Sequence, residues 1–451
     1  MKKRFSSSSN IAHASNKSRR NKPSQPMGPV RSFCVDSLTH EGKGVARAEG
    51  KVTFIAGALP SETVKAQVFK SNRRFDEAKL VSIDQPSKHR VSPECVHYDA
   101  CGGCSFQHLA IEEQRQAKQL WLQGQLRKVC KPEQIEVLLD LPLAYRRRAR
   151  LAVHVVAGKC LLGFRGHSSK QIVPIENCIV LTPSLQKTFG ALKNALVDQP
   201  ISPSLNNKIG HLELLDDDKG VSVLCRLTAN ISADEQAVWQ DWAKHQRLQW
   251  YWQHAEESSA LVAPQDRREY QVDGLKLSYH PQDFIQVNGA MNEKMLAQAI
   301  EWLAPNKDDV ILDLFCGVGN FSLPLAKRAK QVVGVEVQES MVQAASNNAK
   351  VNRLTNVSFI AADLTKDKVP AISELGVTKV LLDPPRAGAY DFLPSLVKLR
   401  PEIILYVSCD AATLARDAEF LLEKRYKVVR AAMMDMFPQT AHLETMLLFV
   451  R

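Results

Sequence analysis

Five short apolar segments alternate with stretches of helical length in the last third of this 451-residue chain. Buried parallel strands appear in a sequence as nearly continuous apolar runs, and the helices between them cover both faces of the sheet. From residue 283 onward, the alternation therefore predicts a parallel, doubly wound α/β sheet. Its strands are expected at 309–315, 331–337, 357–361, 378–382 and 402–408.

Polar residues stand where these strands end, which is the edge at which such sheets bind ligands. The first strand runs into Gly317-Val318-Gly319, whose glycines allow a close approach to a ligand at a helix N-terminus. The third glycine of a dinucleotide-binding fingerprint is absent. Glu336 ends the second strand and suits ribose hydroxyls, and Asp363 follows the third and suits an adenine amino group.

A single acid at a strand end more often caps the next helix than binds a ligand. Three consecutive strands with polar ends nevertheless predict a nucleotide-type site. Their order resembles the class I S-adenosylmethionine methyltransferase fold. That resemblance implies one antiparallel strand near the end of the chain, at 445–451.

Cys409 follows the fifth strand, where an apolar run changes abruptly to small polar residues. Asp383 ends the preceding strand in an Asp-Pro-Pro-Arg sequence, and Glu444 lies 35 positions beyond the cysteine. A cysteine after a strand is usually a small core residue. A thiol accompanied by two acids instead indicates covalent catalysis by a nucleophile with a separate base.

The length of the chain predicts two or three domains. The net charge of +11 is uneven, because residues 1–31 contain only basic charged residues. A tail at 1–29 is therefore expected to be disordered, and it either keeps the protein soluble or contacts nucleic-acid phosphates. No apolar stretch is long enough to span a membrane or to form a signal peptide, so a cytoplasmic protein is expected.

Between the tail and the predicted sheet, two further regions differ in pattern. Residues 30–88 have short strands, glycine turns and many lysines and arginines, as in a small oligonucleotide-binding β-barrel. The alternative is a barrel with a merely solvated basic face. Residues 89–282 mix strands with helices near 110–128 and 233–246, which predicts an α+β domain.

Four cysteines of the central region form a candidate metal site. Cys95, Cys101 and Cys104 are clustered around two glycines, and Cys178 is a possible fourth ligand. A disulfide framework is improbable in a long chain without an export signal. Zinc and iron–sulfur clusters both accept four thiolates, and the spacing by itself favours zinc.

Together, five motifs resemble those of the RNA uracil-5-methyltransferases across residues 30–451. They are Phe284-Ile285-Gln286-Val287-Asn288, Asp313-Leu314-Phe315-Cys316-Gly317-Val318-Gly319-Asn320-Phe321, Asp383-Pro384-Pro385-Arg386-Ala387-Gly388, Ser408-Cys409-Asp410 and His442-Leu443-Glu444. The resemblance implies a TRAM barrel at 30–88, a central domain at 89–282 and an S-adenosylmethionine-dependent methyltransferase domain at 283–451. It also implies that the helix at 110–128 packs on the catalytic domain.

Residue roles follow from the same resemblance. Cys409 would be the nucleophile, Glu444 the general base, and Phe284 and Asp383 would lie near the target base. The four cysteines Cys95, Cys101, Cys104 and Cys178 would hold a [4Fe-4S] cluster rather than zinc. S-adenosylmethionine contacts would fall on Gln286, Phe315, Asn320, Glu336, Asp363 and Asp383.

The implied substrate is RNA and the implied product is 5-methyluridine. A barrel together with the cysteine set is similar to the bacterial 23S rRNA branch, and a dual-site rRNA or a tRNA enzyme is the alternative. The protein is expected to act as a monomer without a membrane partner. A target uracil must leave its stack to reach the nucleophile, so a looped or single-stranded RNA is the natural substrate.

Two other classes compete with an enzyme of this kind. A non-catalytic RNA-binding factor would not need Cys409, Glu444 and the acids of the cofactor site. An iron–sulfur electron carrier would have no use for Asp383 and Cys409. Both are therefore less favoured.

Overall fold

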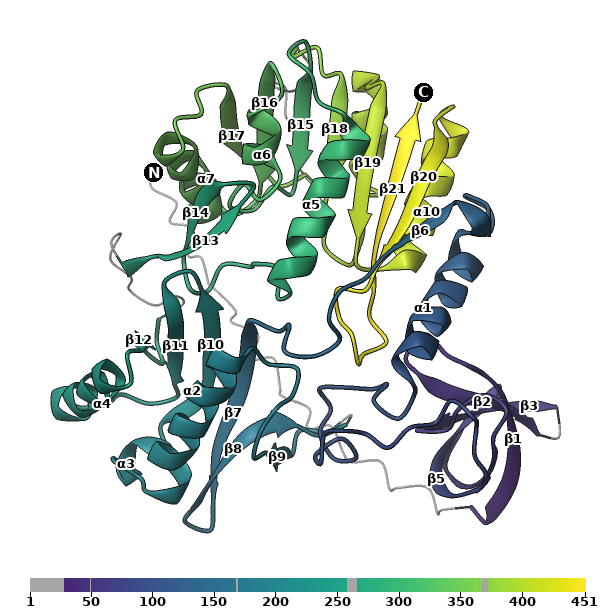
Figure 1. Ribbon diagram of the computed structural model, residues 1–451, viewed down its shortest axis with the longest axis vertical. Helices are drawn as coiled ribbons and strands as arrows, with labels where there is room; N and C mark the ends of the chain where they lie inside the picture. The colour runs from purple at the N-terminus through teal and green to yellow at the C-terminus, as the bar shows by residue number, and fades with distance from the viewer. Residues whose placement is uncertain are drawn as a thin grey trace, which may run out of the picture.

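The structure, a computed structural model, describes residues 28–48, 50–167, 169–257, 266–364, 366, 372 and 374–451. Apart from its last two residues, the basic tail expected at 1–29 lies outside the described residues. A small barrel, a central sheet and a larger α/β unit form three lobes (Figure 1). None of the described helices is long and apolar enough to cross a membrane.

The N-terminal lobe is a closed five-stranded barrel with strand order β1-β2-β3-β5-β4. Alternating apolar side chains, among them Phe33, Val35 and Ile55, fill its interior. The predicted barrel is therefore confirmed. Its strands are β1 (Val30–Leu38), β2 (Lys43–Ala48), β3 (Lys51–Ala56), β4 (Thr63–Ser71) and β5 (Phe75–Gln85).

The central lobe is a six-stranded sheet with the order β12-β11-β10-β7-β8-β9 and helices packed on it. Its strands are β7 (Arg148–Val156), β8 (Lys159–Arg165), β9 (Ile172–Pro174), β10 (Ile209–Asp217), β11 (Gly220–Leu227) and β12 (Gln249–Gln253). Its helices are α2 (Pro183–Lys193), which continues into a π-helical turn at Asn194–Asp198, α3 (Pro203–Asn206) and α4 (Ala233–His245).

The largest lobe contains an eight-stranded sheet with the order β17-β16-β15-β18-β19-β21-β20-β6. The five predicted parallel strands are present, and the expected antiparallel strand is β21. The strands are β6 (Ile135–Leu138), β15 (Val310–Leu314), β16 (Gln331–Glu336), β17 (Val357–Ala361), β18 (Lys379–Leu382), β19 (Ile403–Ser408), β20 (Lys427–Met434) and β21 (Glu444–Val450).

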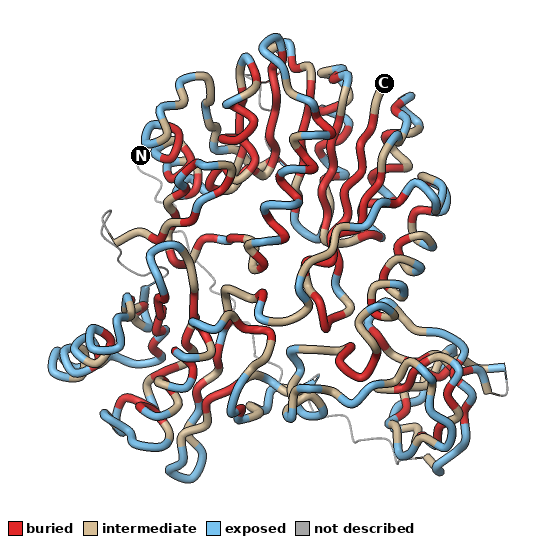
Figure 2. The backbone as a smooth tube through the Cα atoms, in the orientation of Figure 1, coloured by how far each residue is buried: buried red, intermediate tan, exposed pale blue. Residues whose placement is uncertain are grey.

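Two apolar clusters, one on each face, bury the middle strands of this sheet, whereas the edge strands β17 and β6 are largely half-buried or exposed (Figure 2). One face packs on α5 and α7, and the other packs on α1 and α10. Asn288 caps α5, and Asp410 caps α10 with hydrogen bonds from two backbone N–H groups. The helices are α1 (Ile111–Leu126), α5 (Gly289–Leu303), α6 (Ser322–Ala326), α7 (Glu339–Val351), α9 (Leu393–Leu396) and α10 (Ala411–Glu423).

Two elements from the region 89–282 belong structurally to the largest lobe. Strand β6 pairs with β20 and extends the catalytic sheet. Helix α1 connects the barrel to this sheet and buries Leu122 and Leu126 against its strands (Figure 1). The largest lobe is thus assembled from two separate parts of the chain.

A buried ion pair joins the central sheet to the hairpin of β13 (Arg268–Val272) and β14 (Leu275–Tyr279). Arg268 Nε donates to Asp217 Oδ2 at 2.9 Å, and the Tyr279 hydroxyl donates to the same oxygen at 2.6 Å. The side chains of Arg268 and Asp217 are only 1% and 0% exposed. Removal of the carboxylate would therefore leave an uncompensated buried cation.

We predict that Asp217→Ala lowers the free energy of unfolding by about 3–5 kcal/mol, the cost of breaking a buried pair. The neighbouring Asp218 is exposed, so Asp218→Ala is the matched control and should change stability little. Chemical denaturation of both variants measures the difference. Equal stability of the two variants would contradict the prediction.

Candidate active site

The antiparallel pairing of β19 with β21 brings Cys409 and Glu444 together. Ser408 lies opposite Thr445 in this pair. Cys409 directly follows Ser408, and Glu444 directly precedes Thr445, so the two residues meet at the same end of adjacent strands. Cys409 is partly exposed, whereas Glu444 is buried. A thiol that solvent can reach thus lies beside a carboxyl group that solvent cannot reach.

Burial determines the protonation state of this pair in the free protein. Burial, together with the charges of Glu444 and Asp383 and against that of Arg386, raises the pKa of the Cys409 thiol to about 11. Burial also raises the pKa of Glu444 well above its ordinary value, with Asp383 adding to the rise and Arg386 opposing it. In the free protein both shifts favour the protonated thiol and the protonated carboxyl group over their ionised forms.

Arg386 is a site residue to which the sequence analysis assigned no role. Its positive charge acts on both Cys409 and Glu444, although its own side chain is exposed. It favours the ionised forms that a nucleophile and a base require. Its place in the Asp-Pro-Pro-Arg motif, three residues after Asp383, is the sequence feature that could have predicted a role for it.

A buried network below the strand ends fixes the loop that carries Asp383 and Arg386. The backbone N–H of Ala389 donates to Asp417 Oδ2 at 2.8 Å and to the Tyr406 hydroxyl at 3.0 Å. Gly388 has φ +79°, and a Cβ there would lie 2.6 Å from Asp417 Oδ2. Asp417 is buried inside α10, so its helical position gave no sequence signal for this role.

The turn after β15 has the backbone expected of a close-approach loop. Phe315, Gly317 and Gly319 all have positive φ, at 65°, 57° and 94°. The backbone N–H groups of Phe315 and Cys316 both donate to Val335 O, which anchors the turn to β16. The helix that follows, α6, has only five residues.

Three carboxyl groups surround this turn and make the site suited to a cation. Burial raises the pKa of Asp313 and Asp383 to about 7 each, and the charge of Asp383 contributes to the shift of Asp313. Asp313 Oδ1 is buried without a partner among the described residues, while its other oxygen accepts from Ser322. Glu336 accepts from the backbone N–H of Gly317 at 3.2 Å. The sequence analysis assigned no role to Asp313, because it lies within the strand.

The remaining predicted cofactor and substrate residues lie around the same sheet edge. Asn320 exchanges hydrogen bonds with Asn292 at 3.0 and 3.1 Å. The backbone carbonyl of Gln286 accepts from Arg147 Nε at 2.8 Å. Asp363 follows β17 and pairs with Lys366. Phe284 is 67% exposed, which is unusual for a phenyl ring and leaves its face open to a ligand.

The four predicted cysteine ligands lie around one cavity of about 250 Å³ in the central region. Cys95, Cys101 and Cys104 come from the loop before α1, and Cys178 comes from the segment after β9. Burial, with smaller contributions from Cys104, Cys101 and Cys95, raises the pKa of Cys178 to about 12. The structure thus brings together four thiols that the sequence separates by 83 positions.

These thiols are spread around the cavity rather than gathered at one point. Within the described ranges, no group of three or more His, Cys, Asp or Glu side chains is placed to hold one metal ion. All four cysteines are free. Four thiolates are a donor set that both zinc and iron–sulfur sites use.

Comparison with known proteins identifies the class to which this fold and site belong. The family model described as tRNA (Uracil-5-)-methyltransferase matches residues 110–451, and the TRAM domain model matches residues 34–81. The first match covers more than half of the chain, so the protein belongs to this methyltransferase family. The family predicted from the motifs is confirmed.

Individual relatives match over nearly the whole chain. The 23S rRNA (uracil(1939)-C(5))-methyltransferase RlmD of Marinomonas sp. (strain MWYL1) is 58% identical over 94% of this chain and 96% of its own. The protein of the same name from Aeromonas salmonicida (strain A449) is 41% identical over 92% and 95%. The solved Pyrococcus abyssi tRNA (uracil-54, C5)-methyltransferase, a complex with S-adenosyl-L-homocysteine, is 23% identical with a TM-score of 0.74, covering 93% of this chain and 100% of that chain.

The raised pKa values predict that S-adenosylmethionine binding depends on pH. A bound sulfonium cation favours ionised carboxylates, so below pH 7 binding must displace protons from Asp313 and Asp383. We expect the affinity to rise about tenfold between pH 6 and pH 8 for each carboxyl group so coupled.

Titration calorimetry at the two pH values, in buffers of different ionisation enthalpy, measures both the affinity and the protons released. S-adenosylhomocysteine lacks the sulfonium charge and is the matched control, with a weaker dependence on pH. If both ligands bound with affinities independent of pH, these carboxyl groups would not face the cofactor.

Proposed function

We propose that this protein transfers a methyl group from S-adenosylmethionine to C5 of a uridine in 23S rRNA. The observation that carries the proposal is the meeting of Cys409 and Glu444 at the ends of β19 and β21. The names of relatives at 58% and 41% identity support 23S rRNA as the substrate. A tRNA or a second rRNA site is the alternative, and a tRNA is favoured only by the description of the family as a whole.

The two residues suit the chemistry that uracil demands. C5 of uracil is a poor nucleophile, but addition of the Cys409 sulfur to C6 moves the C5–C6 electron pair into an enolate. C5 can then accept the methyl group, which S-adenosylmethionine supplies as an electrophile. Removal of the C5 proton by Glu444 restores the double bond and breaks the bond between sulfur and C6.

The protonation states of the free site give Arg386 and the sulfonium charge a role in this sequence. Cys409 and Glu444 must both lose their protons before they act, and their pKa values are raised by burial. Positive charge nearby favours both ionised forms. Arg386 supplies one such charge permanently. Binding of the cationic cofactor would supply a second at the time of reaction.

The residues around the Gly317–Gly319 turn fit the cofactor. The turn offers backbone that a ligand can approach, and Glu336 stands at the end of β16, where ribose hydroxyls would be bound. The carboxyl group of Asp313, unpartnered at Oδ1 among the described residues, suits a cationic group of the ligand. We assign Gln286, Phe315, Asn320, Asp363 and Asp383 to the same pocket, and Phe284 and Asp383 to the target uracil.

We further propose that Cys95, Cys101, Cys104 and Cys178 hold a [4Fe-4S] cluster. Four free thiols around a cavity of about 250 Å³ support a metal site of four sulfur ligands, and the family resemblance of the sequence motifs favours a cluster over a single zinc ion. Methyl transfer involves no net oxidation or reduction. A structural role for the cluster is therefore favoured over electron transfer.

The central test of the function maps 5-methyluridine in 23S rRNA and in tRNA from cells with and without the gene. We expect loss of one 23S rRNA modification, restored by the wild-type chain but not by Cys409→Ala. Purified Cys409→Ala should also give no denaturant-stable complex with RNA that contains 5-fluorouridine. Restoration of the modification by Cys409→Ala would exclude this residue as the nucleophile, and loss confined to tRNA would favour the alternative substrate.

The cluster is tested by its metal content and colour. Protein purified without oxygen should contain about four iron atoms per chain and absorb visible light as iron–sulfur proteins do. Cys178→Ser should lose most of this iron, whereas Cys225→Ser is the control because Cys225 is buried in the apolar core of the central lobe. Stoichiometric zinc without iron would replace the cluster with a zinc site.

A further inference from the structure

The loop that leads into Glu444 is held by residues from distant parts of the chain as well as by hydrogen bonds within the loop. We call residues 435–443, which join β20 to β21, the base loop. Gln439, in the middle of the base loop, has φ +65°. This is a left-handed backbone conformation that residues other than glycine seldom adopt. A residue keeps this unfavourable conformation only where contacts with the surrounding structure stabilise it. The contacts that do so come from far away in the sequence.

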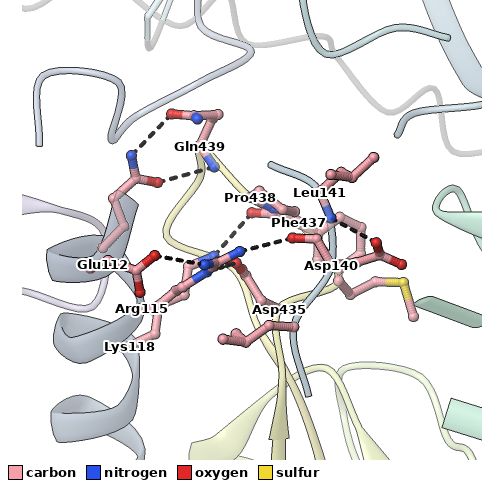
Figure 3. A network of polar contacts seen from close by, with 12 residues as sticks. Glu112, Arg115, Lys118, Asp140, Leu141, Asp435, Phe437, Pro438 and Gln439 are labelled. Carbon is pink, nitrogen blue, oxygen red and sulfur yellow. Dashed lines mark hydrogen bonds and ion pairs between the residues drawn. The ribbon is translucent and has the colours of Figure 1, made fainter. Parts of the chain in front are cut away.

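Helix α1 holds the base loop through Gln114, Lys118 and Arg115, whose Nε donates to Asp435 Oδ2 at 3.3 Å (Figure 3). Gln114 accepts from the Gln439 backbone N–H at 3.1 Å and donates to its side-chain oxygen at 3.0 Å. Lys118 donates to Asp435 Oδ1 at 2.6 Å and to the Phe437 carbonyl at 3.0 Å. Gln114, Lys118 and Asp435 are all buried, at 2%, 3% and 1% exposure.

Ser105 and Phe106, which directly follow Cys104, also form hydrogen bonds with the base loop. The backbone N–H groups of Ser105 and Phe106 donate to the Gln439 carbonyl at 3.0 and 3.1 Å. The Ser105 hydroxyl accepts from the Ala441 N–H at 3.0 Å. Tyr145 adds a hydrogen bond from its hydroxyl to the Pro438 carbonyl at 3.0 Å. Gln439 is thus fixed through its N–H, its carbonyl and its side chain.

The nucleophile is positioned by different contacts. Cys409 lies between β19 and α10, where Asp410 caps the helix through the N–H groups of Ala412 and Thr413. Neither Gln114 nor Lys118 has a hydrogen bond to this turn among those described for the two residues. Loosening the base loop should therefore disturb Glu444 and leave Cys409 in place.

We propose that Gln114 and Lys118 are positioning residues for proton removal, because they clamp the base loop and thereby aim Glu444 at the substrate. The inference rests on the proposed function of Glu444. It assigns a role in the last chemical step to a helix that precedes the catalytic strands by about 300 residues and carries none of the predicted catalytic residues. Asp435 is the partner through which Lys118 acts.

The test separates proton removal from the earlier steps. Gln114→Ala and Lys118→Met should each lower kcat on uridine RNA by roughly 10- to 100-fold, which is at or below the lower end of what general-base catalysis contributes, because the base is displaced but not removed. The KM for RNA should change little. Both variants should accumulate a methylated, denaturant-stable enzyme–RNA complex, as should Glu444→Gln. Complex formation with 5-fluorouridine RNA should stay near the wild-type rate, because fluorine replaces the C5 hydrogen and the complex is trapped without removal of a C5 proton by Glu444.

Matched controls lie on or beside the same helix. Gln116 is exposed two positions from Gln114, and Lys128 forms a solvent-exposed pair with Glu419 at 3.4 Å. Gln116→Ala and Lys128→Met should turn over like the wild type. Gln114→Ala removes no charge, so it keeps the test available if Lys118→Met does not fold.

Two outcomes would overturn the clamp: unchanged turnover in both Gln114→Ala and Lys118→Met, or a parallel loss of turnover and of the 5-fluorouridine complex. The second would mean that α1 only supports the fold. A wild-type protein that forms no complex with 5-fluorouridine RNA would instead remove the proposed function. The two failures are therefore distinguishable.

Discussion

The insertion of β21 between β19 and β20 is the constraint on which the rest of the site depends. It runs against both neighbours, so its first residue arrives at the edge where the parallel strands end. Glu444 reaches Cys409 only through this reversal of direction. A parallel strand in the same position would deliver its last residue there, and the base loop would lie at the opposite edge of the sheet.

Burial of the same edge then gives the site its electrostatic character. Asp313 and Glu444 are buried and Asp383 is half-buried, and their pKa values rise because water stabilises their charges less. Such a site is costly to ionise when empty and favourable to ionise around a cation. The geometry and the charge therefore point to the same class of ligand, a positively charged methyl donor.

The sequence predicted the elements whose signal is local and missed those that depend on tertiary contacts. The apolar runs located the parallel strands within one or two residues, and the glycine pattern located the turn after β15. Nothing local predicts that β6 joins the catalytic sheet, because a four-residue strand has no distinctive period. Asp417 and Gln114 were also missed, since a polar residue within a helix is ordinarily a solvated one. The spacing of Cys95, Cys101 and Cys104 indicated a shared metal site with Cys178 as a possible fourth ligand, whereas only the resemblance favoured a cluster over zinc.

The edge strand β6 has a consequence for how the protein is made. The ribosome releases residues 135–138 long before β20, the only strand with which β6 pairs among those described. Helix α1 is likewise synthesised well ahead of Asp435, the acidic partner of its buried Lys118. The largest lobe is therefore completed late in synthesis. Strand β6 and helix α1 find their partners only after β20 and Asp435 have left the ribosome. A nascent chain stalled before residue 427 would contain the complete barrel. Its methyltransferase sheet would lack β20 and β21, so β6 would have no strand to pair with.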